Sequence, residues 1–194
     1  GILLFNVESE QELLALDRVA GLGRMKAPVA LRINPDIDPQ THPYISTGLK
    51  QNKFGIPFDR SVDVYREAKA LEYIDPVGVH CHIGSQILEI QPFVDTLGRI
   101  KELVKKLREE SIQVKYLDLG GGLGITYEDE VAPPPSEYVE ALLRELGDLD
   151  CTLIFEPGRV LVGNAGIMVT RIRQAFSAAG VDATADWSQP GFGG

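Results

Sequence analysis

The 194-residue sequence is poor in cysteine and in positive charge, and it has no long apolar run. No stretch is long enough to cross a bilayer and no secretory signal precedes the first expected strand, so we expect a cytoplasmic protein without a membrane anchor. Lys and Arg number 19 against 28 Asp and Glu, and the net charge of -9 argues against nucleic acids and anionic membranes as partners. The two cysteines fit reduced, buried thiols better than a disulfide framework.

Metal-binding patterns are equally scarce. Cys151 has no cysteine or histidine nearby at a spacing typical of zinc sites. Cys81 lies between His80 and His82, but neighbouring residues of a strand point to opposite faces of the sheet. We therefore predict that the chain holds no metal ion.

An alternation of strands and helices makes up most of the chain. We expect strands over 2–7, 29–34, 77–83, 116–119 and 152–155, separated by four helices. This order predicts a parallel sheet covered by helices, which suits a (β/α) barrel or an open doubly wound sheet. Five strands are too few to close an eight-stranded barrel. The segment 172–194 is rich in Ala and Gly and weakly periodic, so we expect an irregular tail that is flexible or artificial.

The helices have recognisable starts and apolar stripes. Ser9 is expected to cap the first helix, with Glu12 as its capping-box partner. Ser136 is expected to cap the last one. In the clearest helix, over 91–110, apolar residues recur at helical spacing: Phe93, Leu97, Ile100, Val104 and Leu107. This stripe predicts core packing and carries no chemistry.

Glycine and polar residues gather where the strands end. The strand over 116–119 runs into four glycines, Gly120, Gly121, Gly122 and Gly124. Such a turn exposes backbone N–H groups to a phosphate, but glycine clusters also make ordinary turns, and this stretch alone fits both.

Two further strands carry polar residues of interest. His80 and His82 fall on one strand face and run into Gly84 and Ser85, which can offer an N–H and a hydroxyl to an anion. A lone strand histidine is more often a core residue, yet the adjoining Gly-Ser favours binding here. Arg32 lies among apolar residues, so it needs an anionic partner or a ligand, or else reaches solvent at the rim. The long connection over 36–57 is typical of a lid or binding loop.

Several motifs point together to one family. They are HCHIGSQ over 80–86, DLGGGLG over 118–124 and EPGR over 156–159, with LRINP over 31–35 and STGLKQNKFGI over 46–56. In order and spacing they resemble the diaminopimelate decarboxylases, pyridoxal-phosphate enzymes of the alanine-racemase-like barrel class. HIGSQ is similar to this branch rather than to the ornithine and arginine decarboxylases. The resemblance implies a partial TIM-type (β/α) barrel over 1–171, from about its fourth to its eighth strand, that binds pyridoxal 5'-phosphate.

The resemblance also implies roles on the ring side of the cofactor. His82 would stack on one face of the pyridine ring, and Glu156 would meet the ring nitrogen. A carboxylate there keeps the nitrogen protonated, so that the ring can accept the electrons left when carbon dioxide departs from Cα. A racemase of the same fold would do better with a cation, so Glu156 favours decarboxylation.

The phosphate side follows in the same way. Ser85 would touch the phosphate, and Gly121 and Gly122 would present N–H groups to it, with Gly120 closing the strand. Pro157 and Gly158 would belong to the same cofactor-binding stretch. Arg159 would reach the phosphate and the carboxylate of an amino-acid substrate, because its planar fork suits both.

The chain also departs from the family. The Schiff-base lysine of a YAxKAN-like motif has no counterpart, since Lys50, Lys53 and Lys115 do not match it, and the β-domain with its CES-type motif is missing. We therefore expect an inactive fragment of an enzyme that converts meso-diaminopimelate to L-lysine and that is a homodimer in the family. The alternatives are a related ornithine- or arginine-type decarboxylase, a non-catalytic half-barrel that binds pyridoxal phosphate or another phosphorylated ligand, and a structural half-barrel whose open edges pair.

Overall fold

Strands and helices alternate as expected in the computed structural model, which describes residues 1–37, 54–167 and 169. The elements are β1 (Phe5–Val7), α1 (Glu10–Leu22), β2 (Ala27–Asn34), β3 (Ile56–Pro57), α2 (Ser61–Ala70), β4 (Ile74–His80), α3 (Gln91–Glu109), β5 (Tyr116–Asp118), α4 (Pro135–Leu146), β6 (Thr152–Ile154) and α5 (Arg159–Val162). A 3₁₀ turn (Phe58–Arg60) leads into α2. The compact unit spans 1–164, and the tail over 172–194 lies outside the described residues. No described helix has the length and apolar character needed to cross a membrane.

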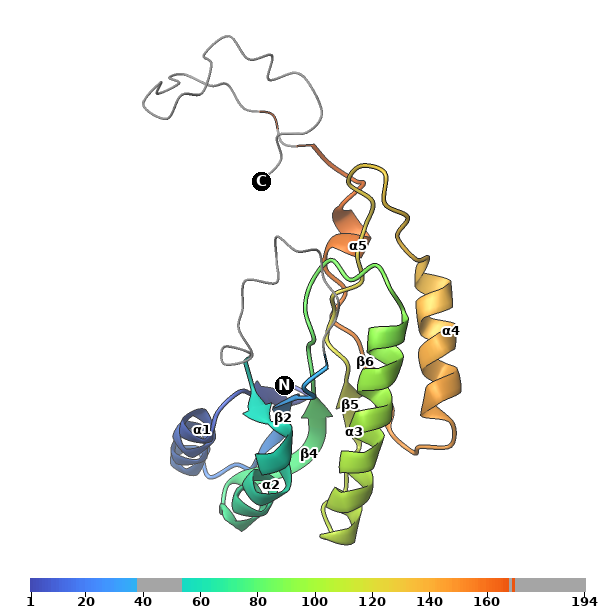
Figure 1. Ribbon diagram of the computed structural model, residues 1–194. Coiled ribbons are helices and arrows are strands. Elements are labelled where there is room, and N and C mark those ends of the chain that lie inside the picture. The colour runs from blue at the N-terminus through green and yellow to red at the C-terminus, as the bar shows by residue number, and fades with distance from the viewer. Residues whose placement is uncertain (38–53, 168, 170–194) are drawn as a thin grey trace, which may run out of the picture. The chain divides into compact units, whose positions relative to one another are not determined.

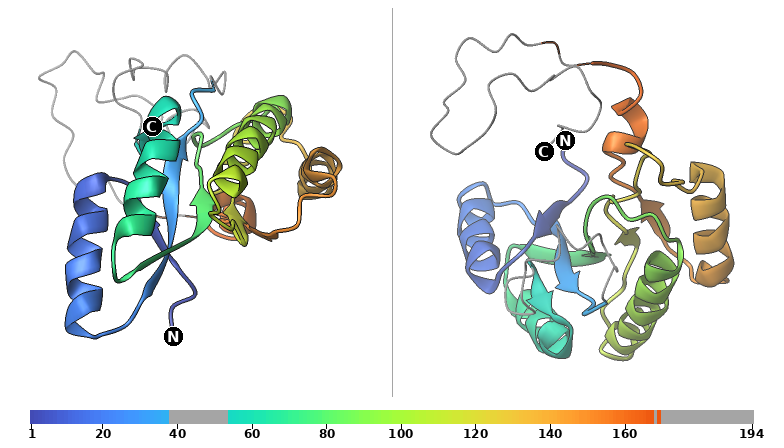
Figure 2. Two further views of the ribbon diagram at one scale, coloured as in Figure 1. Left: turned by 90° about the horizontal axis from the view of Figure 1, so that it is seen from below. Right: turned by 45° about the horizontal axis from the view of Figure 1, so that its top comes forward.

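The described strands form a parallel sheet in the order β1-β2-β4-β5-β6, with β3 paired to β2. The helices α1 to α4 follow one another around its outer side (Figures 1 and 2). In a flat sheet, β1 and β5 would be three strand spacings apart, or about 14 Å. Yet the Asn6 side chain of β1 donates a hydrogen bond of 2.9 Å to Asp118 of β5. The sheet must therefore curve strongly, as a segment of a barrel wall does, and this decides against the open doubly wound alternative.

The register of the strands aligns the polar residues at their carboxyl ends. Arg32 of β2 pairs with His80 of β4, His80 pairs with Asp118 of β5, and Asp118 pairs with Ile154 of β6. Residues at one level of a parallel sheet point to the same face. The Arg32, His80 and Asp118 side chains therefore share one face of the curved sheet.

The core lies between the sheet and the helices. The predicted stripe of α3 is confirmed, because all five of its apolar side chains are buried. Tyr138 of α4 contacts Phe93 of α3 edge to face, with ring centroids 4.8 Å apart, and Phe155 after β6 at 5.9 Å. These contacts join two neighbouring helices to the end of the last strand.

The predicted helix starts fare differently. Ser9 caps α1 as expected, since its Oγ accepts a 3.2 Å hydrogen bond from the N–H of Glu12. The Glu12 carboxylate, however, accepts from the N–H of Glu8 rather than from that of Ser9. The prediction for Ser136 is wrong: α4 begins one residue earlier, at Pro135, with Pro134 in the capping position. Pro134 has no polar side-chain atom, so no side-chain cap is made, and the fixed φ of Pro135 suits the first helical turn.

Strand boundaries differ by a few residues from those expected. β1 is shorter than the range 2–7, and β4 begins at Ile74 and ends at His80 rather than covering 77–83. His82 therefore lies beyond the strand, where the two-residue alternation no longer fixes its direction. Most of the predicted lid over 36–57 falls outside the described residues, but Ile56 and Pro57 pair with the end of β2.

Candidate active site

The three motifs found in the sequence meet at the carboxyl ends of β4, β5 and β6. The glycine segment after β5 lies between the other two. On one side the N–H of Ile87 donates to the carbonyl of Gly122 at 2.9 Å, and on the other the N–H of Glu156 donates to the carbonyl of Gly120 at 2.8 Å. The fold thus brings HIGSQ, GGG and EPGR to one edge of the sheet.

The glycines are required here by close backbone packing. A Cβ on Gly121 would lie 2.2 Å from the carbonyl oxygen of Glu156, and one on Gly122 would lie 2.2 Å from that of Gly84. Gly120 and Gly122 also have positive φ angles of 66° and 110°, which other residues rarely adopt. Any side chain in this triplet would separate the strand ends that build the site.

The N–H groups of the triplet have different partners. Gly120 donates to the carboxylate of Asp118 at 2.9 Å, and Gly121 donates to Nδ1 of His82 at 3.2 Å. Of the three glycines, only Gly122 has an N–H without an acceptor among the described residues. Of the two N–H groups expected to meet a phosphate, Gly122 is therefore free to do so, whereas Gly121 orients His82.

His82 is half-buried beside the glycines. Because Nδ1 accepts the hydrogen bond from Gly121, the proton of the neutral ring must sit on Nε2. Burial lowers the pKa of His82, and the nearby Arg32 cation lowers it further. A neutral, fixed imidazole of this kind can lie flat against an aromatic ligand.

Glu156 is held from one side by a cluster of polar residues. Nδ2 of Asn6 lies 3.3 Å from Oε1 of Glu156 and 2.9 Å from Oδ2 of Asp118, and it donates to both. Nε2 of His80 lies 3.5 Å from Oε2 of Glu156. The Glu156 side chain remains 47% exposed, so its other side is open to a ligand.

His80 is a buried histidine without a hydrogen-bond partner within the described part of the chain. Both of its ring nitrogens are buried and unpaired, as are Oδ1 of Asn6 and Nε of Arg32. Burial lowers the pKa of His80, while the Asp118 and Glu156 carboxylates oppose that shift. The imidazole is therefore neutral near pH 7.

The same side chains bear on the predicted absence of a metal ion. His80, Asp118 and Glu156 offer ligand atoms that all lie within 4.8 Å of one another. The amide hydrogens of Asn6, however, already point at both carboxylates, where a cation would have to bind. The absence of a metal site remains a prediction.

The other expected site residues lie around this centre. Arg32 forms an ion pair with Glu8, so the expectation of an anionic partner is confirmed. Arg159 is exposed and donates a 3.0 Å hydrogen bond to the Tyr127 hydroxyl. The remaining three, Ser85, Pro157 and Gly158, are exposed.

Sequence reasoning missed Asn6, gave Asp118 no role of its own, and singled out His80 only as the neighbour of His82 on one strand face. Asn6 lies at the amino-terminal end of the chain, 150 residues from Glu156. The one available signal was its place in a strand between the apolar residues Phe5 and Val7, where an asparagine amide needs hydrogen-bond partners.

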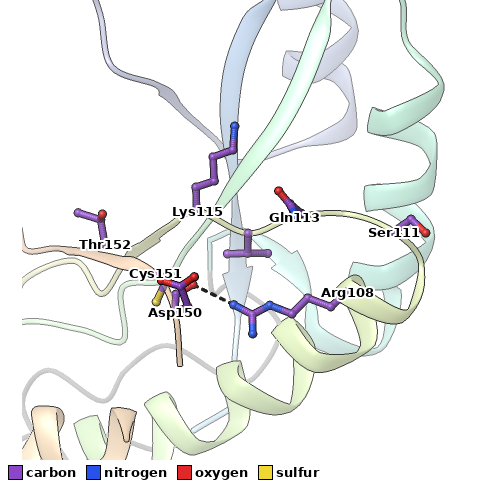
Figure 3. Close-up of a pocket in the computed structure, with 8 residues that line it drawn as sticks. Arg108, Ser111, Gln113, Lys115, Asp150, Cys151 and Thr152 are labelled. Carbon is purple, nitrogen blue, oxygen red and sulfur yellow. Dashed lines mark hydrogen bonds between the residues drawn. The ribbon is translucent and has the colours of Figure 1, made fainter. Parts of the chain in front are cut away.

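A hollow of about 870 Å³ lies at the amino ends of β5 and β6, the end of the sheet opposite the motifs. Arg108, Lys115 and Cys151 are among its lining residues, and Arg108 donates to the carbonyl of Asp150 at 2.9 Å (Figure 3). Burial raises the pKa of the Cys151 thiol, so it is not an activated nucleophile. Among the described residues that line this hollow, none belongs to a motif.

Comparisons with known proteins agree on one family. Residues 1–163 match the pyridoxal binding domain of the pyridoxal-dependent decarboxylases. A diaminopimelate decarboxylase of Vibrio cholerae is 54% identical over 172 residues, covering 88% of this chain and 41% of that protein. One of Pseudomonas aeruginosa is 52% identical, covering 89% and 41%. The chain thus spans about two fifths of the length of these relatives.

Solved structures show the same likeness. The diaminopimelate decarboxylase of Helicobacter pylori complexed with L-lysine matches with a TM-score of 0.76 and 42% identity, over 81% of this chain and 40% of that one. The enzyme of M. jannaschii matches with a TM-score of 0.73 and 41% identity, over 82% and 39%. A lysine decarboxylase of Selenomonas ruminantium, with a TM-score of 0.69 but 21% identity, shares the fold.

Proposed function

Because the chain belongs to the pyridoxal-dependent decarboxylases, we propose that it forms the cofactor-binding part of an enzyme that decarboxylates meso-diaminopimelate to L-lysine. The diaminopimelate decarboxylases that match at 54% and 52% identity support this substrate over ornithine or arginine. The observation that carries the proposal is the meeting of the three motifs at one end of the curved sheet.

The residues present fit pyridoxal 5'-phosphate. A half-exposed carboxylate, a neutral imidazole, a free backbone N–H and an exposed guanidinium all lie on the strand ends that carry the motifs. Together they match a flat pyridine ring with a basic nitrogen at one end and a phosphate at the other. The buried, unpaired ring nitrogens of His80 further mark this region as a polar centre rather than an apolar core.

Glu156 and His82 would act on the ring. When bound, pyridoxal phosphate supplies an electron sink for the pair left on Cα as carbon dioxide departs. Glu156 would hold a proton on the ring nitrogen with its exposed side, while Asn6 donates to its other side and Nε2 of His80 lies 3.5 Å away. His82 would lie against one face of the ring and exclude water from it.

The phosphate would be bound by the surrounding loops. Gly122 would donate its N–H and Ser85 its hydroxyl. Arg159 would add a planar cation, whether or not it keeps its hydrogen bond to the Tyr127 hydroxyl. Gly120 and Gly121 would shape the turn and orient His82, and Pro157 and Gly158 would carry the chain from Glu156 to Arg159. Arg159 is also the residue we assign to the substrate carboxylate.

A non-catalytic binding module is the second candidate. It rests on the same strand-end groups, because the N–H of Gly122 and the exposed Arg159 can bind a phosphate without any covalent bond to the protein. Turnover of meso-diaminopimelate by the purified 194-residue polypeptide with pyridoxal phosphate would count against this candidate. For the whole enzyme we infer a cytoplasmic homodimer with a small amino acid as its substrate.

Calorimetric titration with pyridoxamine 5'-phosphate tests the cofactor site, since this amine form does not react with surface lysines. We expect saturable binding that a Glu156→Ala, Arg159→Ala variant weakens by about tenfold or more, because two charge-assisted contacts are lost. A Glu137→Ala, Arg144→Ala variant removes the same two charges from the exposed face of α4 and should bind normally. Absence of binding to the unchanged chain would contradict the proposal.

A further inference from the structure

The amide of Asn6 lies between two carboxylates that belong to different parts of the site. Its Nδ2 donates to Asp118 at 2.9 Å and to Glu156 at 3.3 Å. Asp118 also accepts from the N–H of Gly120 at 2.9 Å. One side chain of β1 is therefore joined, directly or through Asp118, to both the glycine turn and the ring-side carboxylate.

The chemistry of this arrangement requires a neutral donor. An NH₂ group carries two hydrogens, one for each carboxylate, whereas a carboxylate in its place could only accept. Two negative charges this close repel each other, and a donor shared between them offsets that repulsion. Because both neighbours are acceptors, the amide must be oriented with its nitrogen toward them.

Both the backbone and the side chain of Glu156 are held by neighbouring residues. Its N–H bonds to Gly120, its carbonyl packs on Gly121, and its two carboxylate oxygens face Asn6 and His80. Only the remaining side of the carboxylate, part of the 47% exposed surface, is open to a ligand. A carboxylate held in this way has one direction in which it can accept a further hydrogen bond.

We propose that Asn6 is a positioning residue that aims the Glu156 carboxylate at the ring nitrogen of the bound cofactor. This inference rests on the proposed function, because it assigns the ligand of Glu156. Asn6 itself touches neither the cofactor nor the substrate; it acts through Glu156 and, by way of Asp118, keeps the glycine turn in register with it.

Two asparagine-to-aspartate variants provide the test. Asn6→Asp removes the shared donor with almost no change of shape. Asn34→Asp makes the same change at the end of β2, where Oδ1 of Asn34 accepts from the N–H of Asp36 and an aspartate can do the same. The probes are pyridoxamine 5'-phosphate and its 1-deaza analogue, in which a C–H replaces the ring nitrogen.

We expect Asn6→Asp to weaken binding of pyridoxamine 5'-phosphate by about tenfold or more, as for a lost charge-assisted hydrogen bond. Binding of the deaza analogue should not change, because it makes no bond to Glu156. Asn34→Asp should bind both probes as the unchanged chain does. The inference would be overturned if Asn6→Asp weakened the binding of both probes equally, or if it weakened the binding of neither.

A swapped variant, Asn6→Asp with Asp118→Asn, separates positioning from folding. The new amide at 118 can still accept from Gly120 and can donate to the new aspartate, so the thermal midpoint of unfolding should lie close to that of the unchanged chain. No donor to Glu156 returns, so affinity for pyridoxamine 5'-phosphate should stay low; recovery of that affinity would refute the assignment. If the unchanged chain binds neither probe, both the proposed function and this inference fail. If the unchanged chain binds pyridoxamine 5'-phosphate and Asn6→Asp binds it equally well, only this inference fails.

Discussion

Gly121 shows how much one residue decides at the strand ends. The position that a Cβ would occupy lies 2.2 Å from the carbonyl oxygen of Glu156, closer than any stable contact allows. Its N–H is also committed, because it fixes the tautomer of His82. The triplet of glycines therefore contributes close packing and orientation as well as one free N–H for a phosphate.

Replacing Gly121 with Ala should damage both the fold and the site. The backbone after β6 would have to move, and overpacking of this kind costs about 1–3 kcal/mol of unfolding free energy. Urea unfolding and pyridoxamine 5'-phosphate titration would measure the two effects. Gly98→Ala is the control: Gly98 lies inside α3, and its new Cβ would lie 3.6 Å from Oε1 of Glu145 on α4, an ordinary van der Waals contact, so alanine there should stabilise by about 0.5–1 kcal/mol. A Gly121→Ala chain as stable as the original would contradict the packing argument.

At the scale of elements, the two serines expected to cap helices behave differently. Ser9 precedes α1 and has an extended backbone, with φ of -150°. This conformation lets its side chain accept a hydrogen bond from the N–H of Glu12. Ser136 follows three prolines and already lies inside the first turn of α4. Only a residue outside the helix can cap it, so the same amino acid contributes to one helix start and not to the other.

The serine pair gives a matched test. Ser9→Ala should lower the free energy of unfolding by about 1 kcal/mol, because the N–H of Glu12 loses its acceptor. Ser136→Ala should leave it nearly unchanged, since that serine makes no capping hydrogen bond. Both values come from urea denaturation monitored by circular dichroism. Equal losses in the two variants would show that Ser136 is a cap after all.

On the scale of the whole molecule, the curved sheet gathers charged and polar groups that must remain in defined protonation states. Burial lowers the pKa of His80 and of His82, with Arg32 adding to both shifts and Asp118 and Glu156 opposing them. The folded chain therefore binds fewer protons at these two rings than the unfolded chain does at the same pH.

Stability should consequently fall as the pH drops below the ordinary histidine value of about 6.5. Above that pH both histidine rings are neutral in the folded and the unfolded chain, so their contribution to the free energy of unfolding does not change with pH. Below it the unfolded chain takes up protons first, and stability falls until the pH reaches the lowered pKa of the folded chain. Each histidine that is protonated in the unfolded chain and neutral in the folded chain adds at most about 1.4 kcal/mol per pH unit to the slope of the free energy of unfolding. Urea unfolding between pH 7.5 and 5.5 would measure the slope, which His80→Asn should reduce. An unchanged slope in that variant would exclude His80 as a source.

The sequence by itself determined the main strands and helices to within a few residues, the motifs that follow the strands and the family that the chain resembles, but not the short elements β3 and α5. These features are local, because a periodicity of two or of 3.6 and the order of short motifs can be read along the chain. Only the tertiary structure decided that Asn6 reaches Asp118 and Glu156, that both ring nitrogens of His80 are buried without a hydrogen bond from the described residues, and that the N–H of Gly121 donates to His82. The physical reason is the curvature of the sheet, which brings together residues 112 and 150 positions apart and which no local pattern specifies.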